Sequence, residues 1–224
     1  MAAGEGSRLR PITERWPKPI LPVDGRPVIA TLLRELRSAG IERVTIVTGH
    51  LAEQVETLLG DGSGFGLLLS YVRQPRADGS ADAVHRALQG GAAAPVVVAG
   101  ADTVFAAGSV ATFREAWGDA PGALAARVGQ PASGGKPGIR IVDGRVVKVI
   151  DPGTSELTSV PLWGLGAEIV PLLEGLSGPP FEIKDAYERA LVAGLEVRGV
   201  VVPGTRDLTH PVDLVQENFP YLTP

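Results

Sequence analysis

The chain has 224 residues, of which 44% are hydrophobic and 21% are charged, and its formal net charge at pH 7 is −4. This length and balance predict a folded globular protein with a sizeable core and argue against a disordered chain. The slightly acidic charge, with a pI near 5.4, gives no reason to expect a nucleic acid or an anionic membrane as a partner.

Several kinds of site are disfavoured by residue type. Cysteine is absent from the sequence, which excludes disulfide bonds and thiolate chemistry. His50, His85 and His210 show no metal-ligand spacing, and no serine lies in a G-x-S-x-G hydrolase motif. The longest apolar run, residues 92–101, is too short to cross a bilayer, and the first residues show no apolar signal-peptide core. We therefore expect a cytoplasmic protein with no membrane partner.

Residues 4–22 combine a short glycine turn, two cations and several prolines. Glycine allows the backbone to approach an anionic ligand closely, and proline holds Lys18 on a stiff, extended path. Together with Arg8, these features predict a phosphate-binding segment. The spacing alone is equally compatible with an ordinary surface turn, because neither the P-loop motif nor the dinucleotide glycine motif is present.

The first half of the chain alternates between helical and strand patterns. Apolar residues recur at helical spacing in 27–39, and Gly40 follows as a cap. The further elements that we expect are strands at 43–48, 67–72 and 95–99 and helices at 51–59 and 80–89. This alternation favours a doubly wound, parallel sheet, in which ligands bind beyond the carboxyl ends of the strands.

The second half has a different pattern. Strands are expected at 139–142 and 146–150, on either side of the hairpin signal Asp143-Gly144. Later residues predict helices at 168–173 and 182–193 and a strand at 196–202. We expect antiparallel strands and a substrate-binding layer in this half, and the sequence shows no internal repeat.

Residues 3–23 read Ala-Gly-Glu-Gly-Ser-Arg-Leu-Arg-Pro-Ile-Thr, a short gap, and Pro-Lys-Pro-Ile-Leu-Pro-Val. This stretch resembles the two-part signature of the sugar-1-phosphate nucleotidyltransferases, and similar segments recur along almost the whole chain. The resemblance implies one domain, residues 1–224, with a nucleotide-binding half at 1–120 and a sugar-binding half at 121–224. The expected fold is α/β: a Rossmann-like, doubly wound, mainly parallel sheet with a smaller antiparallel sugar-binding layer.

Both the resemblance and the logic of the sheet require an apolar strand immediately before Ala3 and Gly4, and this first strand is missing from the sequence. A central strand of about five residues contributes on the order of 5 to 10 kcal/mol through burial, comparable to the stability of a whole domain. We therefore expect the native start to lie upstream of Met1.

The resemblance implies Mg²⁺-dependent transfer of a nucleotidyl group from a nucleoside triphosphate to a hexose-1-phosphate. Arg8 would hold the triphosphate, and Lys18 would hold the sugar phosphate. Gln74 would read the base, and its amide, both donor and acceptor, suits the uracil or thymine of UTP or dTTP. A polar turn that caps a helix at Ser80 remains a compatible interpretation of that segment. The nucleotide-binding residues that the resemblance implies are Ala3, Gly4, Gly6, Gln74 and Gly79.

Two aspartates lie in segments similar to the metal-binding motifs of the family. Asp102 follows an apolar strand, and Asp207 lies near the C-terminus. Either residue alone is more typical of a turn or a cap, but two carboxylates from distant segments suit Mg²⁺. For the sugar, the resemblance implies Gly138, Asp151 and Asp185.

Some positions depart from the family pattern. Ala101 replaces the usual glycine before the metal aspartate, and Ile150-Asp151 replaces a Glu-Lys pair at the sugar site. Two alternatives therefore stay open: a nucleotidyltransferase with a non-sugar acceptor, such as phosphocholine or a molybdopterin-type cofactor, and a weakened homologue that binds nucleotide sugars as a regulatory subunit. The sequence does not determine the sugar, and a homo-oligomer remains open.

Overall fold

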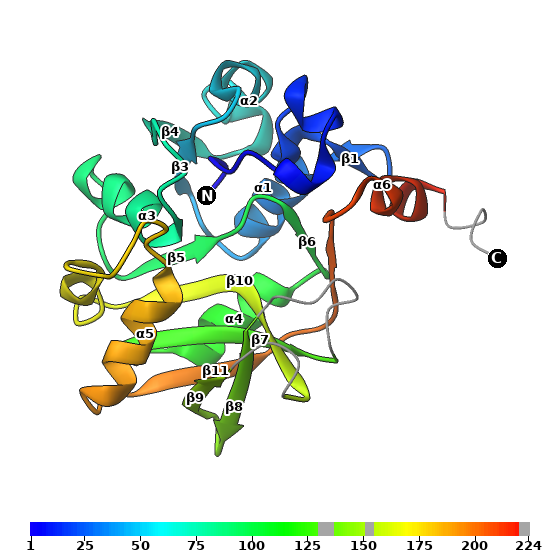
Figure 1. The fold of residues 1–224 in the computed structure, drawn as a ribbon. Coiled ribbons are helices and arrows are strands. Elements are labelled where there is room, and N and C mark those ends of the chain that lie inside the picture. Colours follow the sequence, from blue (N-terminus) through cyan, green and yellow to red (C-terminus); the bar gives the residue numbers. More distant parts are fainter. Residues whose placement is uncertain (130–136, 151–154, 220–224) are drawn as a thin grey trace.

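The computed structural model describes residues 1–129, 137–150 and 155–219 (Figure 1). The α-helices are α1 (Val28–Ser38), α2 (Ala52–Leu59), α3 (Ser80–Gln89), α4 (Ser109–Trp117), α5 (Ile183–Val192) and α6 (Pro211–Asn218). The strands are β1 (Pro22–Val23), β2 (Arg26–Pro27), β3 (Arg43–Thr48), β4 (Leu68–Arg73), β5 (Val96–Ala99), β6 (Thr103–Phe105), β7 (Gly122–Val128), β8 (Gly138–Val142), β9 (Arg145–Ile150), β10 (Leu157–Leu165), β11 (Val197–Val201) and β12 (Thr205–Asp207). Short 3-10 turns are η1 (Ser7–Leu9), η2 (Ile12–Glu14), η3 (Lys18–Ile20), η4 (Ser63–Phe65) and η5 (Val170–Leu173).

The predicted elements of the first half are confirmed, with ends shifted by at most a residue or two. In α1 the apolar residues at 28, 29, 32, 33 and 36 are all buried, as a stripe on one side of a helix requires. The next strand, β3, carries the β-branched run Val44-Thr45-Ile46-Val47. In the second half, the segment expected as a helix at 168–173 contains only the 3-10 turn η5.

The strands form two main sheets. β3 and β4 pair in parallel, while six other strands form a sheet in the order β5-β10-β7-β11-β9-β8. In that larger sheet β7 and β11 are parallel, and the other described pairs are antiparallel. The α/β class, with both parallel and antiparallel strands, is therefore confirmed, and the antiparallel share is larger than the alternation of elements in the first half indicated.

The strand responsible for this difference is β10, which the sequence did not predict. It lies between β5 and β7 and is antiparallel to both. Its sequence contains Pro161 and Gly164, residues that normally weaken a strand. Proline is tolerated because the register against β7 shifts between Ser159 and Trp163, and the Pro161 carbonyl accepts a hydrogen bond from the Gly100 amide at 2.8 Å.

Helices cover both faces of the larger sheet (Figure 1). On one face α1 and α4 pack against inward-facing residues such as Ala99, Ala125 and Leu162. On the other face α3 and α5 cover the alternate residues, including Val98 and Leu124. Alternate residues of each strand thus point to opposite faces of the sheet, as expected for a strand that is buried on both faces. The two hydrophobic clusters therefore form two layers of core, one on each face of the sheet.

Between β3 and β5 the structure places the first two residues of the chain. The Ala2 amide donates to the Val47 carbonyl at 2.8 Å, and the Ala101 amide donates to the Met1 carbonyl at 2.9 Å. Met1 and Ala2 thus contact both sheets at the position where the sequence led us to expect a first strand.

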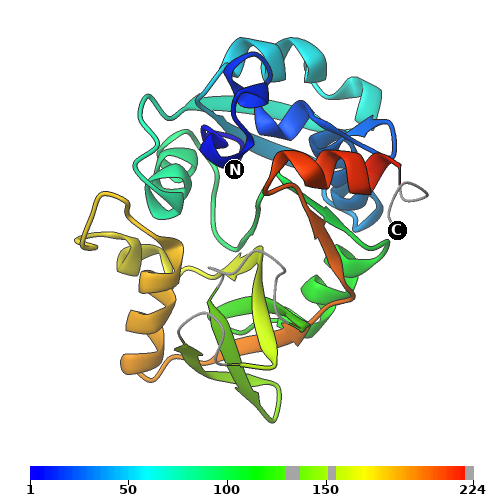
Figure 2. The ribbon, with the colours of Figure 1, turned by 45° about the vertical axis from the view of Figure 1, so that its right-hand side comes forward.

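The C-terminal part of the chain returns to the N-terminal part. β12 pairs with β6, and α6 lies beside the first residues of the chain (Figure 2). The Asn218 side chain fastens α6 to the β1–β2 hairpin, since it donates to the Pro22 carbonyl at 2.8 Å and accepts from the Gly25 amide at 3.2 Å. Among the described residues, none of the helices has the length and apolar character needed to cross a membrane.

Candidate active site

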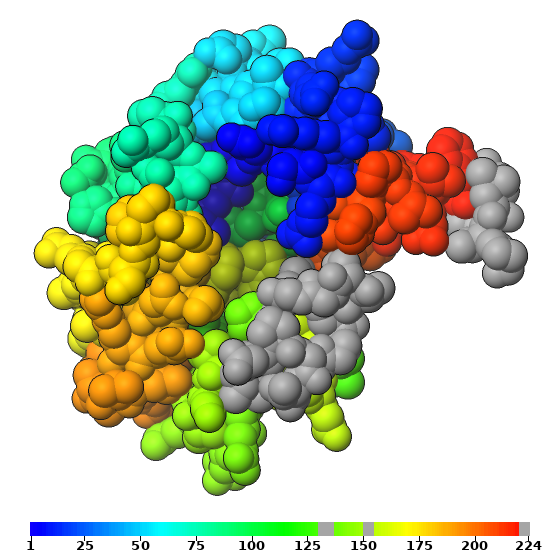
Figure 3. Space-filling model, in the orientation of Figure 1, coloured from blue at the N-terminus to red at the C-terminus, as the bar shows by residue number. Residues whose placement is uncertain are grey.

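A pocket of about 410 Å³ lies where the N-terminal segment meets the carboxyl ends of the parallel strands. In the space-filling view it is the hollow between the blue N-terminal residues and the yellow residues that precede α5 (Figure 3). Its lining includes all of the site residues expected in the first half of the chain: Ala3, Gly4, Gly6, Arg8, Lys18, Gln74, Gly79 and Asp102.

The glycine turn is held in shape by contacts within its own segment. Gly6 has a φ of 62°, and a Cβ there would lie 2.9 Å from the Thr13 methyl group, so a side chain is excluded. Thr13 Oγ1 donates to the Gly6 carbonyl at 2.9 Å, and His50 Nε2 lies 2.6 Å from the Thr13 carbonyl oxygen. Buried Leu9 anchors the next turn. The loop is therefore preformed, with exposed Arg8 on the pocket side.

Lys18 and Asp102 meet in this pocket although 84 residues separate them. Lys18 Nζ donates to Asp102 Oδ2 at 2.6 Å. The lysine side chain is 17% exposed and the aspartate side chain is 41% exposed. The ion pair holds the ammonium at the edge of the pocket, and the better exposed carboxylate keeps surface available for another ligand.

Asp207 lies next to Asp102 because of strand pairing. In the antiparallel β6–β12 pair, Asp207 is opposite Thr103, the residue that follows Asp102. Thr103 Oγ1 donates to Asp207 Oδ1 at 2.7 Å, and Arg127 Nη2 lies 3.8 Å from Asp207 Oδ2. Asp207 itself does not line the pocket, whereas Thr209 does. The register places Asp207 one residue away from Asp102 across the strand pair.

This donor set suits magnesium. Mg²⁺ usually keeps several waters and binds one or two carboxylates together with substrate phosphates. The part of the chain that the structure describes contains no cluster of three or more histidine or acidic side chains that could form a closed metal site. Asp102 at the pocket, with Asp207 on the adjacent strand, fits an open site that substrate phosphates would complete better than a closed one.

Gln74 directly follows β4 and is 4% exposed. Its Nε2 donates to the Gly79 carbonyl at 3.0 Å and to Asp82 Oδ2 at 2.8 Å. Burial alone would raise the pKa of Asp82, but hydrogen bonds from Arg86 and Gln74 outweigh it, and the pKa lies below its ordinary value of 3.8. The Gln74 amide thus supports the loop that follows it, and its role toward a base stays a prediction.

Position 79 must be a glycine because two chain segments approach each other closely there. Its φ is 108°, and a Cβ there would lie 2.3 Å from the Phe181 carbonyl oxygen. Next to it, Ser80 Oγ donates to Glu182 Oε2 at 2.6 Å and accepts from the Ile183 amide at 2.8 Å. The loop before α3 is therefore fastened to the start of α5, which brings Glu182 to the pocket.

The residues expected at the sugar lie elsewhere or are not described. Gly138 is buried at the start of β8, opposite Ile150 and Thr158, and does not line the pocket. Asp185 pairs with Lys184 at 2.8 Å, which raises the pKa of Lys184, and it lines a separate surface hollow. Asp151 lies outside the described residues.

Several pocket residues were not among the predicted site residues. On the side that faces the N-terminal segment, the lining contains Ser80, Pro161, Pro180, Glu182 and Thr209. Glu182 is the N-cap residue of α5, with extended backbone angles. An acidic residue immediately before a helix was the available signal, but the sequence does not show which side chain of residues 181–186 faces the pocket.

Comparison with known proteins agrees with this geometry. A family model described as Nucleotidyl transferase matches residues 1–129. The chain is 30% identical over 230 residues to the low-salt glycan biosynthesis nucleotidyltransferase Agl11 of Haloferax volcanii, and 31% identical over 233 residues to a glucose-1-phosphate thymidylyltransferase of Streptomyces griseus. Each alignment covers 97% of this chain and 64% of the relative, so the chain spans less than two thirds of their length.

The fold has a close counterpart among solved structures. A Bacillus anthracis protein named as a glucose-1-phosphate thymidylyltransferase, crystallised with sucrose, superposes with a TM-score of 0.84 and 22% sequence identity. That match covers 97% of this chain and 91% of the other. The family match spans the residues that bring Arg8, Lys18 and Asp102 together, and we conclude that this chain belongs to the nucleotidyl transferase family.

Proposed function

We propose that the protein transfers a nucleotidyl group from dTTP or UTP to a hexose-1-phosphate and requires Mg²⁺. An oxygen of the sugar phosphate attacks the α-phosphorus and forms a new P–O bond. The bond from the α-phosphorus to the β-phosphate bridging oxygen breaks, and pyrophosphate leaves with the electron pair. Such a reaction asks the protein mainly to position two phosphates and to neutralise charge.

The observation that carries the proposal is the convergence of Arg8, Lys18 and Asp102 on one pocket. Arg8 is exposed at the glycine turn, where a guanidinium can bind phosphate oxygens with two parallel hydrogen bonds. Lys18 supplies a compact positive charge that its ion pair with Asp102 already orients. Two separate cations on one pocket suit a reaction that brings two phosphorylated substrates together.

Asp102 and Asp207 are the residues that would hold Mg²⁺, which would offset negative charge on the triphosphate. The ion pair with Lys18 orients the Asp102 carboxylate, and Arg127 Nη2 lies 3.8 Å from Asp207 Oδ2. When a sugar phosphate binds, Lys18 can exchange the Asp102 carboxylate for a phosphate oxygen.

The choice of substrates is supported by the lining and by the relatives. Gln74 and the loop to Gly79 form the wall where a base would lie, and the Streptomyces griseus relative is named for a thymidylyl transfer to glucose-1-phosphate. Glu182 and Thr209 on the other wall are polar groups that can bind sugar hydroxyls. We therefore place dTTP first, UTP second, and glucose-1-phosphate first among the acceptors.

The test is pyrophosphate release in Mg²⁺ from a grid of five nucleoside triphosphates against glucose-, mannose-, galactose- and N-acetylglucosamine-1-phosphate. We expect turnover on one pair, and a fall of about 10² to 10³ in kcat for Asp102→Asn, since the carboxylate charge is lost. The matched control is Asp119→Asn, an exposed aspartate that does not line the pocket and is expected to leave kcat unchanged.

Two outcomes would replace the proposal. Turnover that appears only with a non-sugar phosphate would retain the reaction and change the acceptor. Calorimetric binding of a nucleotide or nucleotide sugar by folded protein, with no pyrophosphate released anywhere on the grid, would identify the regulatory alternative.

A further inference from the structure

His50 does not line the active-site pocket, yet it bonds to both ends of the loop that carries Arg8. The His50 amide donates to the Ala3 carbonyl at 3.3 Å, and the ring nitrogen Nε2 lies 2.6 Å from the Thr13 carbonyl oxygen. Ala3 precedes the glycine turn and Thr13 follows it, so this one residue spans the whole loop. No sequence motif singled out His50, and only these contacts connect it with the site.

The contact between the ring and Thr13 determines where a proton of His50 lies. A carbonyl oxygen can only accept a hydrogen bond, so Nε2 must carry a proton and donate it. The separation of 2.6 Å is shorter than is usual for an N–H···O bond, and Thr13 is 1% exposed. Removal of this donor would take away the ring partner of a carbonyl in a buried residue, which favours movement of the segment.

Further hydrogen bonds connect Thr13 to the turn that contains Arg8. Thr13 Oγ1 donates to the Gly6 carbonyl at 2.9 Å, and the same carbonyl accepts from the Leu9 amide at 2.8 Å. Arg8 lies between Gly6 and Leu9, in the 3-10 turn η1. The position of the Thr13 carbonyl therefore affects the direction in which the Arg8 side chain leaves the loop.

His50 itself is attached to a rigid part of the fold. Thr48, the last residue of β3, is fully buried, and its Oγ1 donates to Glu56 Oε1 of α2 at 2.9 Å. A Cβ at Gly49 would lie 2.7 Å from the Ala3 carbonyl oxygen, so the turn after β3 packs directly against the glycine loop. Because β3 and α2 hold the residues on both sides of His50, its ring can fix the position of a loop.

We propose that His50 is a positioning residue for Arg8. Its Nε2–H holds the Thr13 carbonyl, and the bonds from Thr13 to Gly6 hold the turn that presents the guanidinium to the triphosphate. The inference rests on the proposed function, in which Arg8 binds the triphosphate. Two parallel hydrogen bonds from a guanidinium to phosphate oxygens depend on its orientation, so a small displacement of the turn weakens them.

Two substitutions separate the Nε2 hydrogen bond from the presence of a polar side chain. The side-chain amides of glutamine and asparagine both donate, but that of glutamine extends about as far as Nε2 of histidine and that of asparagine only as far as Nδ1. We expect His50→Asn to raise the KM for triphosphate about tenfold and to leave the KM for sugar phosphate unchanged. His50→Gln should restore the KM for triphosphate to that of the parent chain.

A double-mutant cycle tests whether the effect passes through Arg8. In an Arg8→Ala chain, His50→Asn should change kcat/KM for triphosphate by less than about twofold, because the guanidinium that the loop positions is gone. A residue that only stabilises the fold would instead lower kcat/KM by the same factor with Arg8 and without it.

Gln54→Ala is the matched control. Gln54 Nε2 donates to the Arg15 carbonyl at 2.9 Å, so it also fastens α2 to the N-terminal segment, but beyond the loop that His50 spans. Its loss should leave both KM values unchanged. Equal effects of Gln54→Ala and His50→Asn would overturn the proposal, since the cause would then be general fastening of α2.

Amide exchange supplies a readout that does not depend on turnover. We expect exchange in residues 7–14 to be faster in His50→Asn than in the parent chain and to return to the parent rate in His50→Gln, with β8 unchanged. His50→Ala, which has no side-chain donor, should match His50→Asn and replaces it if that chain does not fold.

Exchange in residues 7–14 that is the same in the parent chain and in these variants would overturn the proposal. A KM for triphosphate that His50→Asn leaves unchanged would overturn it as well. Absence of pyrophosphate release from the parent chain would contradict the proposed function, and the exchange rates would then decide separately whether His50 holds the loop.

Discussion

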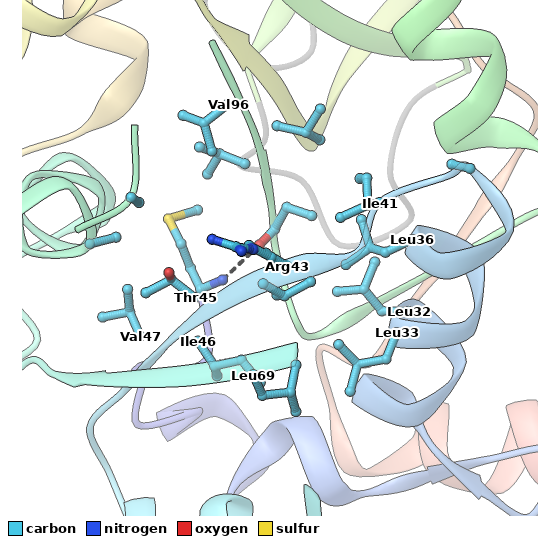
Figure 4. Close-up of a pocket in the computed structure, with 18 of the residues that line it drawn as sticks. Leu32, Leu33, Leu36, Ile41, Arg43, Thr45, Ile46, Val47, Leu69 and Val96 are labelled. Atoms are coloured by element: carbon cyan, nitrogen blue, oxygen red, sulfur yellow. Dashed lines mark hydrogen bonds between the residues drawn. The ribbon is translucent and has the colours of Figure 1, made fainter. Parts of the chain in front are cut away.

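A cavity of about 1290 Å³ lies between β3 and β5, and we call it the β3–β5 groove (Figure 4). This groove and the active-site pocket meet at Met1, which lines both, yet their walls differ in kind. The groove is the larger space, and aliphatic side chains and the backbone edges of two strands surround it. The pocket is smaller, and charged side chains from distant parts of the chain converge on it.

This difference shows why volume is a poor guide to where a ligand binds. Placing charges in a pocket costs desolvation energy, so a site such as that of Arg8, Lys18 and Asp102 is retained for a partner of complementary charge. The β3–β5 groove is enclosed mainly by apolar side chains, whose attraction to a ligand has no direction and selects no particular chemistry.

The largest effect should come from the pocket. Arg8→Ala is expected to lower kcat/KM for pyrophosphate release about 10² to 10³-fold, since a preorganised cation is removed. Arg10→Ala is the matched control, because Arg10 forms an exposed ion pair with Glu5 at 3.1 Å, a type of contact that contributes little. Equal losses in the two variants would remove Arg8 from the phosphate site.

The next effect compares packed core with the groove wall. Leu162→Ala, at a fully buried residue of β10, should lower the free energy of unfolding by about 3 to 5 kcal/mol, and Leu36→Ala by about 2 kcal/mol. Leu36 borders the groove and therefore has fewer neighbours to lose. Urea unfolding measures both. If Leu36→Ala proved as costly as Leu162→Ala, the groove would not be an open space in solution.

A smaller effect distinguishes the extent of the pocket on its sugar side. Glu182→Gln should raise the KM for sugar phosphate about tenfold with little change in the KM for triphosphate, since the carboxylate faces the pocket and its amide replacement can still accept from Ser80. Asp185→Asn should change both KM values less, because Asp185 faces a separate hollow. The reverse order of effects would return the sugar site to Asp185.

The smallest effect concerns the support of the pocket wall. The depressed pKa of Asp82 means that its ionised form stabilises the folded state above its ordinary pKa of 3.8, and that this contribution is lost as pH falls through the lower, folded-state pKa. Asp82→Asn should therefore lose less stability than the parent chain between about pH 6 and about pH 3. Urea midpoints at both pH values test this, and identical losses would contradict it.

Elements whose signals are local were predictable. The β-branched run of β3 and the helical spacing of α3 each lie within one segment, and both were located to the residue. The hairpin β8–β9 followed from Asp143-Gly144 in the same way. In contrast, β10 carries a proline and a glycine, and only its place between β5 and β7 makes it a strand. Local propensity cannot report a partner that lies sixty residues away.

The candidate site also contains some residues that local sequence signals identify and others that only long-range contacts bring together. Residues of the N-terminal signature could be identified from the sequence because their types and spacing lie in one short stretch. The close approach of Gly79 to Phe181 could not, because it depends on how α3 packs beside α5. The same packing brings Glu182 to the pocket. Asp102 and Asp207 were expected to converge; the β6–β12 register places Asp207 opposite Thr103, one residue from Asp102, but Asp207 does not line the pocket, so their shared metal site stays a prediction.

The sequence by itself determined the family, the α/β class and the chemistry of the phosphate-binding segment, because glycine, proline and paired cations carry that information in a local order. Tertiary structure alone decided the partner of Lys18 and the antiparallel place of β10. Those features arise from contacts between segments far apart in the chain, whose pairing depends on burial and hydrogen bonding across the whole fold.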